Sequence, residues 1–327
     1  MLVVLVLIGC RAKVDHFVSH KVVDRATDVP DVGEACATGP ALANAMRSLT
    51  SVENQAHEAL LVAEVTGALC SEVDAREADL AALRAAKNAA PEGRASEIRD
   101  ATLLGQRAHA EAAARFYRAY QHLEARWGTA GEDCPRLNRD DAVVYTFGLF
   151  AGLNALLHDK ASDNAVGVSA DIPSRVARAA DCLDNDALWH VPGALQAAAW
   201  AAVPGSGPAG VDPWGKLVSE ADTGSKTGVR LAYAVLNRIA GNSGRDDLLV
   251  AGLAAQAKSR AEVATDPDWA LFDRYAEIVS LHEADLYWTR TRGYRAKSLD
   301  EVPGSTPTEA TTSTVFGEED PFANPTP

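Results

Sequence analysis

The chain has 327 residues, 47% of them hydrophobic, and is long enough to bury the core of one large domain or two ordinary ones. Its formal net charge of -14 argues against binding to nucleic acid and against electrostatic attachment to anionic lipid. Aromatic residues make up only 6% of the chain, alanine runs recur, and no long apolar/polar alternation bounded by hairpin turns occurs. These features predict an all-α protein.

The first ten residues, MLVVLVLIGC, form an apolar run that ends in a cysteine. The run is too short to cross a bilayer and matches the hydrophobic region of an export signal, although no Lys or Arg precedes it. Its ending, Leu7-Ile8-Gly9-Cys10, resembles the bacterial lipobox, in which the cysteine becomes the lipidated first residue of the mature protein. A buried N-terminal strand is the alternative, but the rest of the chain offers no strand partner. We therefore predict a signal peptide over residues 1–10 and lipidation of Cys10, and Arg11 after it favours the outer membrane.

Two stretches flank the part of the chain that is expected to fold. Residues 11–37 are polar and irregular around Pro30 and Gly33, and we predict that they tether the anchor to a helical-repeat domain at 38–296. Residues 297–327 are rich in proline, threonine and acidic residues, which predicts a disordered tail.

The expected helices are separated by breaks rich in glycine and proline. Two starts are marked by Asp212-Pro213 and Asp266-Pro267, because aspartate caps a helix and proline lacks a donor that would be unsatisfied in the first turn. We predict helices over residues 38–49, 52–87, 96–127, 140–158, 171–182, 191–203, 212–222, 229–240, 246–264 and 266–292.

The stretch from Asp140 to His158, DDAVVYTFGLFAGLNALLH, is apolar on every face. Its length would allow it to span a bilayer. However, its small residues, the polar side chains of Thr146 and Asn154 and its charged flanks suit a helix surrounded by other helices. We predict that it is the buried central helix of the fold.

The later helices are short and regularly spaced. Starts near residues 172, 212 and 245 give steps of 40 and 33 residues, close to the tetratricopeptide period of roughly 34 residues, although its consensus residues are missing. This spacing predicts an α-solenoid of tetratricopeptide-like helical hairpins around the central helix.

Four cysteines remain if Cys10 is lipidated. Folding the first short helix back on the second brings Cys36 and Cys70 to the same level of an antiparallel hairpin. Cys134 precedes the central helix and Cys182 ends the next helix, so folding these two together joins those ends as well. We predict the disulfides Cys36–Cys70 and Cys134–Cys182, with four free buried thiols as the alternative. The absence of a CxxC motif disfavours a zinc site.

Catalytic motifs do not occur in the sequence. His282-Glu283 lacks the second histidine of a HExxH zinc site, and Gly205-Ser206-Gly207 lacks the strand, turn and helix of a nucleophile elbow. No glycine-rich loop carries the Walker lysine. We therefore expect a protein that is not an enzyme and that needs neither a metal nor a cofactor.

Aromatic side chains gather along consecutive helices. They are Phe116, Tyr117 and Tyr120, then Tyr145, Phe147 and Phe150, and then Trp189, Trp200 and Trp214. The simpler interpretation is ordinary core packing. The alternative is a curved helical array that leaves an apolar channel lined by Tyr and Trp.

Several segments, in the same order along the chain, resemble the T-component family of TRAP transporters, which are tetratricopeptide-like periplasmic lipoproteins. The likeness extends over roughly residues 40–292, although Thr146 stands where the family often has tryptophan. The segments are Leu7–Cys10, Ala112–Leu123 with FYRAYQHL, Asp141–His158, Ile172–Leu183 with IPSRVARAADCL, and Gly244–Leu249.

The resemblance implies a periplasmic protein that is held at a membrane by its lipid anchor, partners a periplasmic substrate-binding protein and can assemble as a homotrimer. It also implies a channel for a small apolar ligand, with Tyr117, Tyr120, Tyr145, Phe150 and Trp200 as candidate lining residues. On this basis we predict an accessory component of a TRAP-type transport system, placed at the outer membrane and without a nucleic-acid partner.

Two other functions are compatible with the sequence. The same solenoid can serve as an envelope scaffold that docks proteins without a small ligand, since helical-repeat arrays often present protein-binding surfaces. A hydrolase of envelope material would need clustered carboxylates or a His-Ser pair in a cleft.

Overall fold

The computed structural model describes residues 28–49, 56–87, 95–299 and 301. These residues form ten α-helices and two short 3-10 helices, and no strand occurs among them, which confirms the predicted all-α class. The predicted lipobox with Cys10 and the predicted tail from residue 302 onward lie outside the described ranges.

Each helix predicted from the sequence has a counterpart in the structure. The α-helices are α3 (Val32–Leu49), α4 (His57–Lys87), α5 (Ala95–Trp127), α6 (Arg139–Ala161), α7 (Ile172–Ala180), α8 (Val191–Ala202), α9 (Pro213–Gly224), α10 (Leu231–Asn242), α11 (Asp246–Glu262) and α12 (Ala270–Arg292). The 3-10 helices are η3 (Ser225–Thr227) and η4 (Pro267–Trp269).

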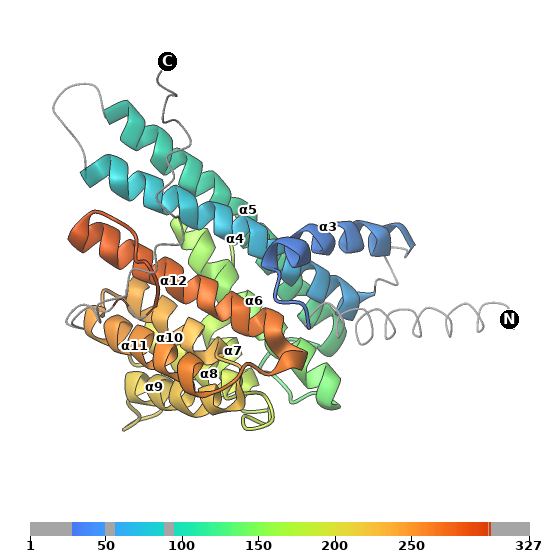
Figure 1. The fold of residues 1–327 in the computed structure, drawn as a ribbon. Helices are drawn as coiled ribbons and strands as arrows, with labels where there is room; N and C mark the ends of the chain where they lie inside the picture. Colours follow the sequence, from blue (N-terminus) through green and yellow to red (C-terminus); the bar gives the residue numbers. More distant parts are fainter. Residues whose placement is uncertain (1–27, 50–55, 88–94, 300, 302–327) are drawn as a thin grey trace, which may run out of the picture.

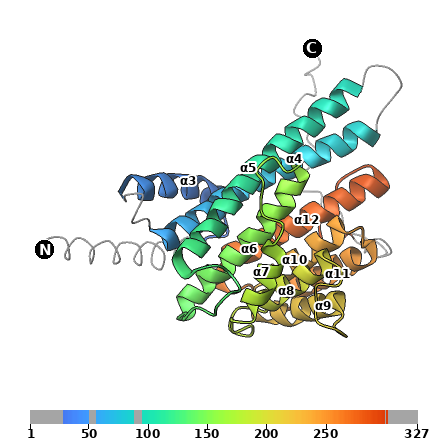
Figure 2. The same cartoon turned by 180° about the vertical axis from the view of Figure 1, so that it is seen from behind.

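The long helices α4 and α5 lie side by side as a hairpin, one end of which projects beyond the other helices (Figure 1). At the other end, α3 packs against α4. The two helices can approach closely because two glycines face each other there: a Cβ atom on Gly39 would lie 2.5 Å from the backbone nitrogen of Gly67. The view from behind in Figure 2 shows the same projecting hairpin.

The remaining helices form two connected sets. α6, α8, α10 and α12 contact one another in turn, while α7, α9 and α11 connect them and pack on their neighbours. α12, the last of the described helices, then returns to contact α4 of the α4–α5 hairpin (Figure 1). Five helices, α4, α6, α8, α10 and α12, therefore meet around the centre of the molecule, and we call them the inner helices.

Helix α6 has the buried position predicted for the central helix. Within the described part of the chain it is the one helix long and apolar enough to cross a membrane, and 78% of its most apolar 18-residue window is buried. α5 packs closely on its glycines: a Cβ atom on Gly148 would lie 2.3 Å from Cδ1 of Leu123, and one on Gly152 would lie 2.5 Å from Cδ2 of Tyr120. These small residues allow α6 to be surrounded by protein.

The ordered body extends beyond the boundaries expected from the sequence. α3 begins at Val32, inside the stretch expected to be a tether, and its residues Val32 and Cys36 are buried in the main core. At the other end, Leu299 packs with Trp288 of α12 in a smaller cluster, inside the stretch expected to be a tail. Buried apolar contacts hold both segments to the body.

The four described cysteines lie in two pairs at disulfide distance. The Cα atoms of Cys36 and Cys70 are 5.3 Å apart, and so are those of Cys134 and Cys182. Both separations lie within the usual disulfide range. The pairs are those predicted from the hairpin geometry, and such bonds form and persist in oxidising compartments.

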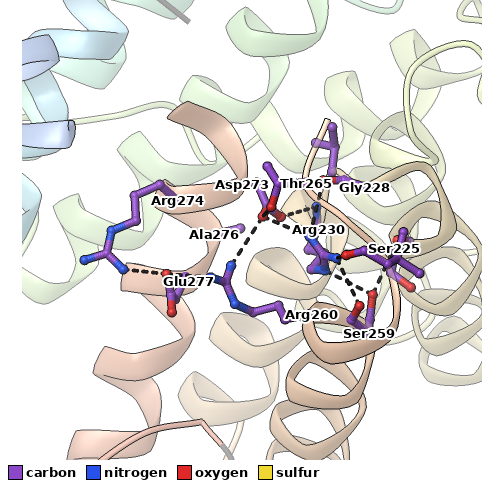
Figure 3. A network of polar contacts seen from close by, with 12 residues as sticks. Ser225, Gly228, Arg230, Ser259, Arg260, Thr265, Asp273, Arg274, Ala276 and Glu277 are labelled. Atoms are coloured by element: carbon purple, nitrogen blue, oxygen red, sulfur yellow. Dashed lines mark hydrogen bonds and ion pairs between the residues drawn. The ribbon is translucent and has the colours of Figure 1, made fainter. Parts of the chain in front are cut away.

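The ends of α10, α11 and α12 are joined by one fully buried guanidinium group (Figure 3). Arg230, just before α10, donates from Nη1 to Oδ2 of Asp273 at 2.9 Å and from Nε to Oγ of Ser259 at 3.0 Å. Its Nη2 donates to the carbonyl oxygens of Ser259 and Val263, and Asp273 also accepts from Thr265 at 2.8 Å. Because its partners lie on α11, at the C-terminal end of α11 and on α12, this one side chain fixes how the three helices meet.

Replacing Arg230 with methionine should lower the free energy of unfolding by about 3–5 kcal/mol, because the carboxylate of Asp273 would stay buried without its main partner. Arg274→Met is the matched control on α12. The ion pair of Arg274 with Glu277 is partly exposed, with 47% of the Arg274 side chain accessible, so this change should cost no more than about 1 kcal/mol. Urea unfolding followed by circular dichroism measures both values. Equal losses in the two variants would contradict the clamping role of Arg230.

Candidate functional site

Five ionisable side chains meet at the centre of the inner helices. They are Glu72 and Arg76 of α4, Arg238 of α10, and Tyr275 and Glu283 of α12, and all five are buried. We call them the central ion cluster. Charged groups are seldom buried unless they are paired, so the contacts within this cluster decide whether the fold is stable.

Glu72 is the shared acceptor of the cluster. Tyr275 donates its hydroxyl to Oε2 of Glu72 at 2.5 Å, and Arg238 Nη2 donates to Oε1. Arg76 Nη2 lies 3.4 Å from the same Oε1, while Arg76 Nη1 donates to Glu283 Oε1 at 2.8 Å. The amide of Asn154, one of the polar interruptions of α6, accepts from Arg238. Four inner helices are thus joined through one carboxylate.

The pairing decides the charge of each carboxylate. Burial alone would raise the pKa of Glu72, but Arg238, His158 and Arg76 outweigh it and hold that pKa well below its ordinary value. For Glu283 burial prevails over the attraction of Arg76 and Arg238 and raises the pKa. Burial, together with the neighbouring Glu72, also raises the pKa of Tyr275. Glu72 is therefore the firmly ionised member of the cluster.

A chain of three side chains connects Glu72 to the surface. Asp79, about one-third exposed, lies 2.9 Å from Nε2 of His109, and Nδ1 of His109 lies 2.8 Å from Nδ1 of His158. Nε2 of His158 is then 3.7 Å from Oε1 of Glu72. Burial lowers the pKa of His158 to about 4, with Arg76 and Arg238 adding to the shift and Glu72 opposing it. His158 is therefore neutral at pH 7.

A pocket of about 150 Å³ opens between α4 and α12, directly beside the central ion cluster. We call it the α4/α12 pocket. Its lining combines apolar walls with polar groups from the cluster and from the mouth. The lining residues are Glu72, Val73, Arg76, Glu77, Tyr275, Ile278, Val279, Leu281, His282, Asp285 and Arg295.

Two lining groups have no hydrogen-bond partner among the described residues. They are Nε2 of His282 and Nε of Arg76, both buried atoms. The whole side chain of His282 is 92% buried, since its exposure is 8%. Burial, aided by Arg76, lowers the pKa of His282 to about 2, so its ring is neutral. A buried polar atom without a partner is costly and marks a position where a ligand or water would bind favourably.

An ion pair lies across the mouth of the pocket. Arg295, in the segment after α12, donates through both terminal nitrogens to Glu77 of α4, with Nη1 at 2.8 Å from Oε1. The same Nη1 lies 3.6 Å from Oδ2 of Asp285. The hydrogen bond from Arg295 lowers the pKa of Glu77. The pair is partly exposed, since 39% of the Arg295 side chain and 52% of the Glu77 side chain are accessible to solvent.

Two further hollows are poorer candidates. A narrow cavity of about 20 Å³ between α6, α8 and α10 is lined by Phe150, Asn154 and Arg238 among others, and has room for about one water molecule. A hollow of about 420 Å³ beside Cys182 is larger, but its polar lining residues Asn138 and Arg139 are exposed. Neither combines a solute-sized volume with buried polar groups.

The aromatic residues suggested by the family resemblance lie outside the α4/α12 pocket. Tyr120 and Tyr145 are almost fully buried, and Tyr120 donates to Oε1 of Glu124 at 3.0 Å. Tyr117 and Trp200 are half-buried at the edge of the core. Phe150 packs edge-on against Tyr275 of the central ion cluster, with ring centroids 5.9 Å apart, and lines the narrow cavity.

The central ion cluster carries one signal that is visible in the sequence. Arg238 interrupts the apolar run LAYAVLNRIA of α10, and an arginine in such a run needs a buried partner. The identity of the partner is not visible, because Glu72 precedes Arg238 by 166 residues.

No family model, no curated protein and no solved structure matches this chain. Within the described residues, no group of three or more His, Cys, Asp or Glu side chains is arranged to hold a metal ion. Function must therefore be inferred from the chemistry of the pocket and of the central ion cluster.

The protein should lose stability as the pH falls below about 6.5, the ordinary pKa of histidine. The pKa of His158 is about 4 in the folded chain, so the unfolded chain binds more protons between these two values. Its contribution is complete above pH 6.5 and is lost progressively as the pH falls to about 4. Between pH 7.5 and 5 this one residue should account for about 2 kcal/mol.

Urea unfolding at several pH values measures this dependence. His158→Gln should flatten the slope between pH 6.5 and 5, whereas Arg274→Met, which changes no histidine, should keep the wild-type slope. An NMR titration in which His158 becomes protonated near pH 6.5 in the folded protein would contradict the expectation.

Proposed function

We propose that this chain is a lipid-anchored protein of the bacterial envelope that binds a small, largely apolar organic solute in the α4/α12 pocket. The pocket is the observation that carries the proposal, because it combines apolar walls, a solute-sized volume and two buried polar atoms without partners. Sites for small ligands commonly join an apolar lining with a few placed polar groups.

The cysteine pairs and the first ten residues support the same compartment. Disulfides are typical of exported proteins, and the N-terminal run ends in a lipobox-like Leu7–Cys10. We therefore propose that the protein works in the periplasm, attached to the outer membrane through Cys10.

The contacts among the inner helices favour a tetratricopeptide-like array. In stacked helical hairpins each helix contacts the next one and the next but one, as α6, α8, α10 and α12 do with their neighbours. We infer from this pattern and from the resemblance that the chain is an accessory component of a TRAP-type transport system. In that role it would present its solute to a periplasmic substrate-binding protein, with the homotrimer as the proposed assembly.

Solute binding can be tested with the exported full-length protein by native mass spectrometry. The wild type should release a small molecule on denaturation. Val73→Trp should abolish this, because Val73 lines the pocket and is 37% exposed, so an indole there would fill the mouth with little strain on the core.

Val211→Trp is the matched control, since Val211 is 39% exposed and lies outside the lining of the pocket. This variant should retain the molecule in the wild-type amount. Wild-type protein that releases nothing, or a Val73→Trp variant that carries as much as the control, would count against solute binding in this pocket.

A second candidate function is that of a protein-docking scaffold, and one observation favours it. Leu103 and Leu104 are 37% and 59% exposed and lie in the N-terminal third of α5, which forms the projecting hairpin with α4 (Figure 1). Adjacent exposed leucines can contribute to a protein interface.

Two variants test whether the exposed leucines form a docking surface that is independent of the pocket. With a photo-crosslinking residue at position 107 in place of Arg107, near the exposed leucines, the scaffold predicts a defined adduct with one envelope protein. Leu104→Glu should then reduce the adduct at least about tenfold by placing a charge in the interface, while Val73→Trp should leave it unchanged. A solute carrier without a docking role predicts no adduct that depends on Leu104.

A further inference from the structure

The charges around the α4/α12 pocket are already paired within the protein. Glu72 is engaged by Arg238 and Tyr275, and Glu77 is engaged by Arg295. Asp285, the third carboxylate of the lining, accepts from the backbone nitrogen of Ala296 at 3.0 Å and lies 3.6 Å from Nη1 of Arg295. A cationic ligand would therefore have to displace an existing partner from one of the three carboxylates. No carboxylate in the lining is therefore free to pair with an ammonium group.

The two arginines of the pocket lining also have partners already. Arg76 donates to Glu283 and Glu72, and Arg295 bridges Glu77 and Asp285. A carboxylate ligand would in addition meet Glu72, Glu77 and Asp285, three acids against the two arginines in the lining. Bringing an anion into this site would cost desolvation without an unpaired cation in return.

The polar atoms of the lining that lack a partner among the described residues are one nitrogen of a neutral ring and one donor of a guanidinium group. His282 lines the pocket, and the buried Nε2 of its neutral ring has no partner among the described residues. Nε of Arg76 is one donor that the ion pairs of this side chain leave unused. A neutral imidazole nitrogen donates or accepts according to its tautomer. One carbonyl, amide or hydroxyl group on a ligand would be sufficient to pair with Nε2 of His282, and it would bring no net charge into the pocket.

The volume and the walls limit the rest of the ligand. A cavity of about 150 Å³ holds a molecule of about the size of benzene, that is, about six heavy atoms. Val73, Ile278, Val279 and Leu281 form the apolar part of the lining. A short or branched hydrocarbon body fits such walls.

We infer that the α4/α12 pocket selects an uncharged solute of about six heavy atoms that carries one carbonyl, amide or hydroxyl group, which His282 recognises through Nε2. This inference rests on the proposed solute-binding function and specifies the chemical class of its ligand. His282 is the residue that determines specificity, and the paired charges exclude organic acids and amines.

Three probes with one carbon skeleton and different charges test the inference. They are 3-methylbutanamide, 3-methylbutanoate and 3-methylbutylammonium, titrated into the full-length exported protein at pH 7.5. Isothermal calorimetry gives the affinities, and the ¹⁵N chemical shift of Nε2 in labelled His282 reports contact. The amide should bind at least about tenfold more tightly than either ion and should shift the His282 signal.

Variants assign the effect to one atom. His282→Phe should weaken amide binding at least about tenfold, and His282→Gln, which keeps a hydrogen-bonding group, should restore part of it. His122→Phe is the matched control, because burial and His57 likewise lower the pKa of His122, to about 4, while it lies outside the pocket. Circular dichroism verifies that each variant is folded.

Each outcome decides the matter. Tighter binding of the acid or the amine, equal binding of all three probes, or a pocket in which only water contacts His282 would overturn the inference. A charged molecule released in the native mass spectrum would overturn it too, yet would leave solute binding in place. Failure of the proposed function looks different, since no molecule would then be released and Val73→Trp would behave as Val211→Trp.

Discussion

The buried carboxylate of Glu72 is the constraint on which the rest of the structure depends. An unpaired carboxylate in a protein interior costs several kcal/mol, so Glu72 is tolerable only when its partners surround it. Those partners come from separate elements, Arg238 from α10 and Tyr275 from α12. Asn154 of α6 in turn accepts a hydrogen bond from Arg238. The packing of α6, α10 and α12 around α4 therefore favours the arrangement that brings all of these groups together.

The same pairing shapes the pocket. Because each acid and each arginine in its lining already has a partner, the side chains that face the solute space are held in place before a ligand arrives. A rigid lining of this kind reduces the entropic cost of binding. It also shifts recognition from charge to shape and to the unpartnered nitrogen of His282. Structural stability and ligand specificity thus have a common origin in the central ion cluster.

The sequence predicts what depends on local chemistry. Caps, prolines and apolar periodicity identify the helices, and the run from Asp140 to His158 identifies the central one. The cysteine pairs follow because each joins two helices that are neighbours in the chain. The candidate site cannot be predicted from local sequence, because Arg76 and Glu283 are separated by 207 residues and meet only through tertiary packing.

Aromatic residues illustrate the same limit. A tyrosine in a core and a tyrosine in a channel look alike in a sequence, and the neighbour that decides between them is remote. Tyr120 lies against Gly152 of α6, where the missing side chain makes room for its ring. Small residues on one helix and aromatic residues on the next therefore favour close packing as well as an open channel, and only the three-dimensional arrangement distinguishes them.

The position of the pocket adds a mechanical consequence. It lies where α12 contacts α4, so the proposed solute, held between these two helices, would stabilise their contact in proportion to its affinity. α4 also continues into the projecting end that it forms with α5 (Figure 1). A ligand that fixes α4 against α12 therefore also fixes the direction in which the hairpin projects. The proposed solute binding would in this way be coupled to the orientation of the α4–α5 hairpin.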